Sequence, residues 1–268
     1  MRAAALGLLL ALLLPRGLEA GPWNRPKGSL YANVSFEYLS TTTLATPDGV
    51  EQEIPRYELV QIGTYAEYGW SERATLILDH FGFRDSSIED FEGASGIEDT
   101  RAGLQWQLGR AGAWLLAARG IVQFPTGDPN KGQGVLATGS GAWEGDALFS
   151  MGRSSSSGRV YGYWEAGYRA RGEGLRDSFL YQGQLGFRAG RTLLIFNVNG
   201  VQPFSSEPGD VLASPSGLGD GTTYTSLGPG IIVELGRGWG VQAEVENAFN
   251  ASNLAVGPKA RIKLYYIK

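Results

Sequence analysis

The side chains able to do chemistry in this sequence are mostly arginines, carboxylates and amides placed at alternate positions of short segments. Gln242, Glu244 and Glu246, for example, are separated by single apolar or small residues. Side chains that share one face of a strand can line a wetted path, or they can pair with one another and fill it. On this pattern we predict a solute path formed by Glu37, Asp79, Arg101, Gln105, Arg119, Glu144, Asp146, Glu165, Arg169, Arg188, Glu244, Glu246 and Arg261.

Composition excludes several other kinds of chemistry. The 268 residues include no cysteine and one histidine, His80. Cysteine zinc sites, iron–sulfur clusters and thiol catalysis all need a sulfur ligand, and a metal site with two histidines is excluded as well. We therefore expect no cofactor and no metal. A formal net charge of −4 provides no basic surface for nucleic acid.

The elements that must position these side chains are segments in which apolar and polar residues alternate. In 104–108, leucine and tryptophan alternate with glutamine, which places the two kinds on opposite faces of a strand. No amphipathic helix pattern competes with this alternation. The segments predicted as strands are 28–39, 55–69, 73–83, 97–108, 113–124, 142–152, 159–171, 179–189, 192–202, 222–235, 240–249 and 257–267.

The connections between these segments alternate in length. The long connections are 40–54, 84–96, 125–141 and 202–221, and the short ones are 69–72, 109–112, 153–158, 190–191 and 236–239. An even number of strands of about 10 residues, with tight turns at one end, is typical of bacterial outer-membrane barrels. We therefore predict an all-β fold, an up-and-down antiparallel transmembrane β-barrel of about 12 strands, formed by residues 21–268.

A soluble β-sandwich or lipocalin-like barrel is the alternative fold, because alternation alone does not say which face is inside. A twelve-stranded soluble barrel would enclose a lumen too wide to fill, since about eight strands already leave room for little more than side chains. Aromatic residues also gather at both strand ends, as rings do at membrane interfaces. Those near the short turns are Trp70, Trp106, Trp114, Phe149, Tyr161, Phe187, Trp239 and Tyr266.

Residues 1–20 are predicted to be a signal peptide. Arg2 precedes an apolar run of about 12 residues, which is shorter than the roughly 20 that a spanning helix needs, and Ala20 offers a cleavage point. An N-terminal membrane anchor is the alternative. We expect Sec export to the cell outer membrane of a Gram-negative-type bacterium, with outer-membrane lipids and the barrel-assembly machinery as partners.

Two motifs suggest a family. Residues 96–104, Gly-Ile-Glu-Asp-Thr-Arg-Ala-Gly-Leu, are followed by Phe124-Pro125-Thr126-Gly127-Asp128. They resemble the Gly-Ile-Gly-Asp-like strand start and the Pro-Thr-Gly-Asp corner of the putative MetA-pathway of phenol degradation family, although Glu98 replaces the second glycine. The resemblance implies a transporter-like outer-membrane barrel, and the strand rhythm extends it over most of the chain.

The corner formed by Pro125, Thr126, Gly127 and Asp128 is a candidate loop gate. Proline removes a ladder donor and ends a strand, and the following residues favour a turn. A purely structural corner is the simpler interpretation, and a contact with a ligand is the functional one.

His80 carries an enzyme hypothesis. Its position in the alternation assigns it to the lipid-facing set with Ala74, Leu76 and Leu78. Neighbouring strand residues point to opposite faces, so Asp79 would not orient the imidazole. An interface histidine is the simpler interpretation, and we expect the protein not to be an enzyme.

The function that these features favour is passive uptake or export of small molecules, aromatic or apolar ones among them, through an outer-membrane channel or transporter. Structural or surface-interaction barrels without flux, an outer-membrane enzyme and a soluble periplasmic binding protein are the alternatives. Mixed charges select no single class of solute. The substrate, the direction of transport and the oligomeric state therefore stay open.

Overall fold

The computed structural model describes residues 21–91, 93–204 and 214–268, so the predicted signal peptide lies outside the described residues. Within these ranges no helix is long and apolar enough to cross a membrane. A single short 3-10 helix, η1 (Lys131–Gly134), accompanies the strands. The strands are β1 (Leu30–Ala45), β2 (Glu51–Gly69), β3 (Ala74–Ile88), β4 (Ala94–Ile97), β5 (Thr100–Ala111), β6 (Trp114–Phe124), β7 (Glu144–Ser154), β8 (Val160–Arg171), β9 (Ser178–Ala189), β10 (Thr192–Pro203), β11 (Thr223–Gly236), β12 (Trp239–Ser252), β13 (Leu254–Ala255) and β14 (Lys259–Ile267).

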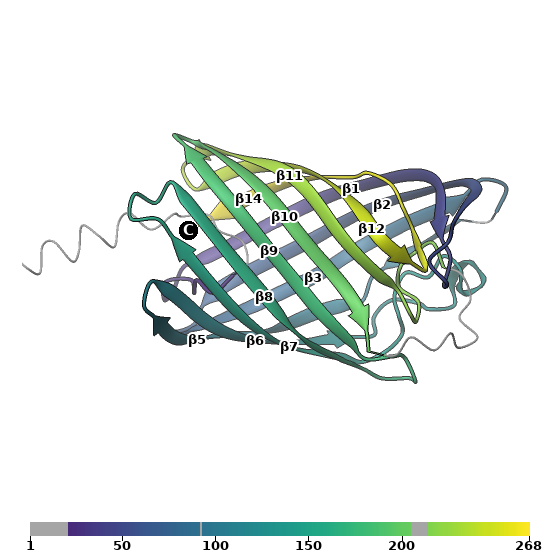
Figure 1. The fold of residues 1–268 in the computed structure, drawn as a ribbon, viewed down its shortest axis with the longest axis horizontal. Helices are drawn as coiled ribbons and strands as arrows, with labels where there is room; N and C mark the ends of the chain where they lie inside the picture. Colours follow the sequence, from purple (N-terminus) through teal and green to yellow (C-terminus); the bar gives the residue numbers. More distant parts are fainter. Residues whose placement is uncertain (1–20, 92, 205–213) are drawn as a thin grey trace, which may run out of the picture.

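Twelve of the strands form a closed ring of antiparallel neighbours. Each pairs with the next long strand along the chain, and β14 closes the ring by pairing with both β12 and β1. Lys263, for example, lies between Ser35 of β1 and Gln242 of β12. The two short strands lie beside this ring, β4 against β3 and β13 against β1. The predicted all-β barrel of 12 strands is confirmed, and Figure 1 shows its strongly tilted strands.

The exterior of the ring is apolar and the interior is polar, which is the reverse of a soluble barrel. Val34, Leu185 and Ile262 are 52%, 63% and 56% exposed on the outside. On the inside, charged and amide side chains are buried, among them Glu165 at 1% exposure. Of the eight rings predicted near the short turns, six are exposed, Tyr266 is half-buried and Tyr161 is buried inside the barrel at 2% exposure. Tyr161 shares its face of β8 with Glu165 and Arg169, which line the lumen, so its assignment to the outer belt is wrong.

The connections differ at the two ends of the barrel. The short turns lie at the end where the chain terminates, on the left of Figure 1. At the other end, two predicted long connections, 40–54 and 84–96, are largely strand. β1 and β2 continue to a tight turn in which the Thr46 N–H donates to Val50 O at 2.9 Å, and β3 folds back onto β4. These hairpin ends carry threonine, serine and glutamate, so they lack the apolar alternation that marks strands in the sequence.

An arginine placed on the outer face should cost far more than one placed inside. Leu185→Arg puts a charge between the two aromatic belts of β9, so we expect a loss of about 2–4 kcal/mol in the free energy of unfolding. The matched control on the same strand is Gln182→Arg, because Gln182 lines the lumen and donates to Glu165 at 2.6 Å. Urea titration in lipid vesicles, followed by heat-dependent gel mobility, measures both. Equal stability of the two variants would contradict the facing described above.

Candidate functional site

The lumen holds two cavities that follow one another along the barrel. The central cavity has a volume of about 440 Å³ and the outer cavity, under the long connections, about 400 Å³. The two are joined at a shared boundary, the neck. The side chains that line both cavities are Glu37, His80, Arg101, Arg169, Asn199, Val201, Tyr224, Glu246 and Lys259.

Most of the predicted solute-path residues line these cavities. Of the thirteen, the exceptions are Gln105 and Arg188. Gln105 is 2% exposed and accepts a hydrogen bond from Arg119 Nη2 at 3.0 Å, next to the Arg119–Glu165 pair at 3.6 Å. Arg188 pairs with Glu234 near the short turns, away from both cavities.

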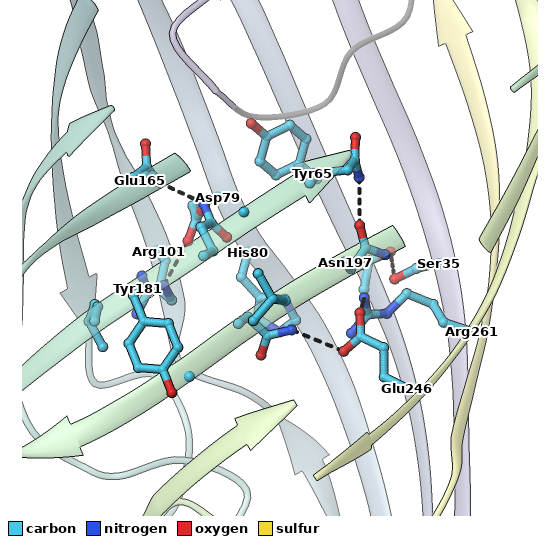
Figure 2. A pocket seen from close by; sticks show the side chains of 18 of the residues that line it. Ser35, Tyr65, Asp79, His80, Arg101, Glu165, Tyr181, Asn197, Glu246 and Arg261 are labelled. Atoms are coloured by element: carbon cyan, nitrogen blue, oxygen red, sulfur yellow. Dashed lines mark hydrogen bonds and ion pairs between the residues drawn. The ribbon is translucent and has the colours of Figure 1, made fainter. Parts of the chain in front are cut away.

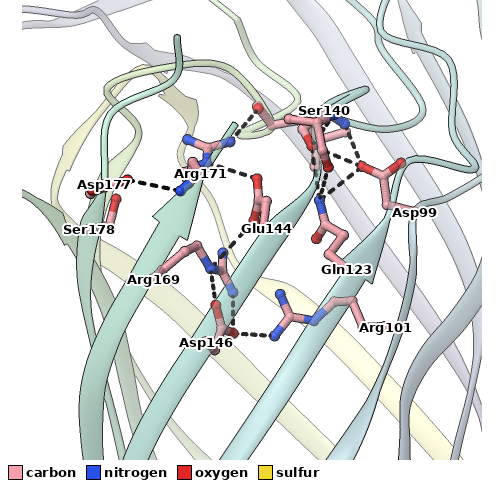
Figure 3. Close-up of polar contacts among 12 residues, drawn as sticks. Asp99, Arg101, Gln123, Ser140, Glu144, Asp146, Arg169, Arg171, Asp177 and Ser178 are labelled. Carbon is pink, nitrogen blue, oxygen red and sulfur yellow. Dashed lines mark hydrogen bonds and ion pairs between the residues drawn. The ribbon is translucent and has the colours of Figure 1, made fainter. Parts of the chain in front are cut away.

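One wall of the lumen carries a set of ion pairs that we call the arginine ladder. Its members come from β3, β5, β7 and β8, and they are Asp79, Arg101, Glu144, Asp146, Arg169 and Arg171. Arg101 joins two carboxylates, with Nε 2.8 Å from Asp79 Oδ2 and Nη2 2.6 Å from Asp146 Oδ2. Arg169 Nε lies 2.7 Å from Asp146 Oδ1, and Arg171 Nε lies 2.8 Å from Glu144 Oε1. Arg169 Nε also lies 3.4 Å from Glu144 Oε2, and Figure 3 shows the part of this network that runs from Arg101 through Asp146, Arg169 and Glu144 to Arg171.

The opposite wall carries a second set at the closure of the barrel, the seam cluster. Its members come from β1, β12 and β14, and they are Glu37, Glu244, Glu246, Lys259, Arg261 and Lys263. Arg261 Nε lies 2.6 Å from Glu37 Oε1, and its Nη1 also pairs with Glu244. Figure 2 shows Arg261 and Glu246 across the cavity from Asp79 and Arg101. Each wall has three positive and three negative groups, so neither imposes a net charge on the lumen.

His80 lies in the lumen, so its predicted lipid-facing position is wrong. The register of β3 shifts between Leu78 and His80 against β5, and that of β2 shifts between Thr64 and Ala66 against β3. Such a bulge adds one residue and turns two successive side chains to the same face. Asp79 and His80 consequently both line the central cavity.

The partner of His80 is Glu98, which is buried between β4 and β5. His80 Nε2 is 2.9 Å from Glu98 Oε2, while Arg84 Nε donates to Glu98 Oε1 at 3.0 Å. Gly82 leaves the space for this pair, because a Cβ there would lie 2.7 Å from His80 Nε2. Asp79 is engaged by Arg101 rather than by His80. In the described ranges no group of three His, Cys, Asp or Glu is placed to hold a metal ion.

The predicted gate residues 125–128 line neither cavity. The Gly127 N–H donates to Asp99 Oδ1 at 2.9 Å, and the Asp128 N–H donates to Thr138 Oγ1 at 3.0 Å. A Cβ on Gly127 would lie 2.6 Å from Gly139 Cα, so the two backbones touch there. The corner thus holds the returning residues 138–140, which do line the outer cavity, against the barrel wall.

The far side of the outer cavity is covered by residues 214–222. Arg84 Nη1 donates to Ser216 O at 3.1 Å, and Arg171 Nη2 donates to Leu218 O at 3.5 Å. The neighbouring β8–β9 connection is held by Asp177, which accepts from the Arg171 N–H at 2.8 Å. Hydrogen bonds from the Tyr168 hydroxyl and from that N–H keep the pKa of Asp177 below its ordinary value. Residues 214–222 therefore fold inward over this end of the lumen.

The other end of the lumen is closed by residues 22–25, which we call the inner plug. Trp23 packs edge-to-face on Tyr161 and Tyr163, with ring centroids 6.0 Å and 6.2 Å away. The guanidinium of Arg25 pairs with buried Glu67 and lies 4.6 Å from the ring centroid of Tyr31. Trp23 also packs against a small apolar core inside the barrel. This core is formed by Tyr31, Tyr161, Leu193, Ile195, Ile232 and Tyr265.

Several lumen residues were not predicted from the sequence. Arg25 lies before the first strand, where no alternation marks its position. Arg84 falls in the predicted long connection 84–96, and Glu98 lies at the start of the predicted strand 97–108 but was not named as a lumen residue. The motif at 96–104 is the signal that could have identified Glu98. Glu98 stands where the family motif has its second glycine, and its side chain contacts His80.

No protein-family model and no curated protein matches the sequence. Among solved structures, the chain is similar to the COG4313 outer membrane channel from Pseudomonas putida F1, with a TM-score of 0.63, 15% identity, and coverage of 94% of this chain and 99% of that one. It is also similar to the NanC porin, with a TM-score of 0.53, 6% identity, and coverage of 88% and 98%. At these identities the likeness shows a shared fold.

Removing Arg101 should destabilise the barrel. In Arg101→Gln, Asp79, which is 23% exposed, loses its ion-pair partner and Asp146, which is 2% exposed, loses one of its two arginines, so we expect a loss of about 1–3 kcal/mol. Arg188→Gln is the matched control, since Arg188 and Glu234 are 21% and 35% exposed and such pairs contribute about 0–1 kcal/mol. Adding Asp79→Asn to Arg101→Gln should recover part of the loss. Urea unfolding measures all three, and similar losses for Arg101→Gln and Arg188→Gln would refute the ladder as a stabilising network.

Proposed function

We propose that the protein is an outer-membrane channel through which small molecules pass passively. The observation that carries the proposal is the pair of polar cavities joined at the neck inside a barrel whose exterior is apolar. A water-excluding belt outside and ionised side chains inside fit a wetted path through a bilayer.

The shared fold supports this placement, because both structures reported above are named as a channel and a porin. The motifs at 96–104 and 124–128 support membership of the putative MetA-pathway of phenol degradation family. Export through the predicted signal peptide 1–20 and insertion by the barrel-assembly machinery complete the proposal. In this orientation the short turns face the periplasm and the longer hairpins face outward.

The outer cavity favours a solute with an apolar or aromatic body and a polar group. One side of this cavity is formed by apolar side chains from β1, β2, β10 and β13, namely Leu39, Leu59, Val201, Leu254 and Ala255. The rest of its lining includes Arg84, Glu98, Glu144 and Arg171. Because the arginine ladder and the seam cluster are each balanced in charge, we expect weak preference between anions and cations.

Both ends of the lumen are narrowed, and this observation favours a second candidate, a structural barrel without flux. The inner plug closes the periplasmic end, and residues 138–140 and 214–222 cover the outer one. In the channel proposal, conduction depends on displacement of the inner plug, which is held chiefly by Trp23 and Arg25.

Loosening the inner plug should raise conductance. We expect wild-type protein in planar bilayers to give a small conductance, and the double variant Trp23→Ala/Arg25→Ala to give a larger one. Trp143→Ala is the matched control, because Trp143 is 54% exposed on the outer surface and should leave conductance unchanged. Liposome swelling with a sugar, an amino acid and a small aromatic acid then compares solute classes.

Folding of each variant is checked first by its heat-dependent mobility on gels. Folded protein that gives no conductance, in the wild type and in the double variant alike, would contradict the channel and favour the structural barrel. A conductance that grows equally in Trp143→Ala would refute the role assigned to the plug.

A further inference from the structure

The end of the barrel with the short turns carries a ring of exposed arginines. Every one of the five short turns has at least one arginine in it or within one residue of it, and none has a lysine. In the part of the chain that the structure describes, none of these side chains takes part in an ion pair. We call them the turn arginines: Arg73, Arg110, Arg153, Arg159, Arg191 and Arg237.

The ring is not a by-product of an overall basic chain. The formal net charge is −4, and Glu72 is the one carboxylate residue in the same sequence windows. The opposite end has the reverse character, since its hairpins expose Asp48, Glu51, Glu53, Asp85, Glu89 and Asp90. The two rims of the barrel therefore differ in sign of charge.

Each turn also carries an exposed aromatic ring within four residues of its arginine. Trp70 is 60% exposed beside Arg73, and Trp239 is 46% exposed beside Arg237. The other turns have Trp114, Phe149 and Phe187, at 40%, 47% and 51% exposure. Aromatic rings of this kind settle at the boundary between hydrocarbon and headgroups. The arginines just beyond them are thus placed at the depth of the lipid phosphates.

We propose that the turn arginines bind the phosphates of anionic phospholipids in the periplasmic leaflet. A guanidinium matches phosphate with two parallel hydrogen bonds, which a lysine ammonium does not, and the basic groups of the five short turns are all arginine, although Lys27 and Lys268 are exposed at the same end. Anionic lipid attracts basic residues held at the membrane surface. The inference rests on the membrane placement of the proposed function and is independent of flux.

The distribution of the arginines favours lipid over a protein partner. A soluble acidic protein would dock on one contiguous patch, whereas these residues recur on all five turns around the barrel. The annulus of lipid surrounds the barrel in the same way. We therefore assign the ring to lipid headgroups, and a protein partner becomes one of the results that the experiment can return.

The experiment measures lipid preference through tryptophan quenching. Mature protein is reconstituted into phosphatidylcholine vesicles that contain brominated phosphatidylglycerol or brominated phosphatidylcholine, and fluorescence quenching gives their relative affinity for the barrel surface. We expect wild-type protein to prefer phosphatidylglycerol by at least about twofold. The preference should disappear at about 1 M salt, where the screening length falls to about 3 Å.

The test variant replaces all six turn arginines with glutamine, and it should lose the preference. The matched control neutralises the six outer carboxylates, with Asp48, Asp85 and Asp90 changed to Asn and Glu51, Glu53 and Glu89 changed to Gln, and it should keep the preference. If the arginine variant does not fold, the salt dependence of the wild-type preference for phosphatidylglycerol still tests whether charged groups cause that preference.

Three results would overturn the proposal: no preference in the wild type, a preference insensitive to salt, or a preference retained by the folded arginine variant. Absence of any preference, combined with salt-sensitive binding of an acidic periplasmic protein, would assign the ring to that protein instead. Wild-type protein that does not associate with vesicles would contradict the membrane placement itself. Absence of conductance in vesicle-bound protein would contradict flux alone and leave the lipid result standing.

Discussion

Closure of β14 against β1 is the constraint on which the other features depend. In hydrocarbon every backbone N–H and C=O must be paired within the protein, and a ring of strands achieves this because it has no edge. Once the ring is closed, alternate side chains point into its lumen. A ring of twelve strands encloses a lumen too wide for side chains to fill completely. Charges placed there must pair with one another, and the arginine ladder and the seam cluster are the two largest groups in which they do.

The lumen combines rigid walls with closures of different character at its two ends. The walls are ion pairs between neighbouring strands, whose regular register brings Asp146 opposite Arg169 and Glu244 opposite Arg261. The outer closure is made of loop backbone held by hydrogen bonds, whereas the inner plug combines one aromatic wedge with one buried ion pair. A solute path through such a barrel is governed by its ends, because the neck between them is already polar.

The sequence predicted the fold and most of the lumen because strand alternation survives wherever the register is regular. Arg101, Arg169 and Arg261, which the alternation assigns to the lumen, line its cavities in the structure. The prediction for His80 is wrong because a bulge adds one residue to β3 and so reverses the alternation beyond it. The sequence pattern alone gives no sign of this extra residue. The hairpin ends of β1 to β4 were missed because they are strands with polar residues on both faces. Arg25 belongs to a segment with no periodicity, so its role depends on tertiary contacts alone.

The inner plug touches strands that are far apart in the order of the barrel. Arg25 pairs with Glu67 of β2 and its N–H bonds to Thr75 of β3, while Trp23 is held by Tyr161 and Tyr163 of β8. These partners face one another across the lumen only after the sheet has curled through the strands between them. Residues 22–25, which precede the first strand, therefore have both sets of partners only in a sheet that has closed around them. Closure of this end of the lumen thus requires a completed sheet, because an incomplete sheet lacks one of the two sets of side chains that hold residues 22–25.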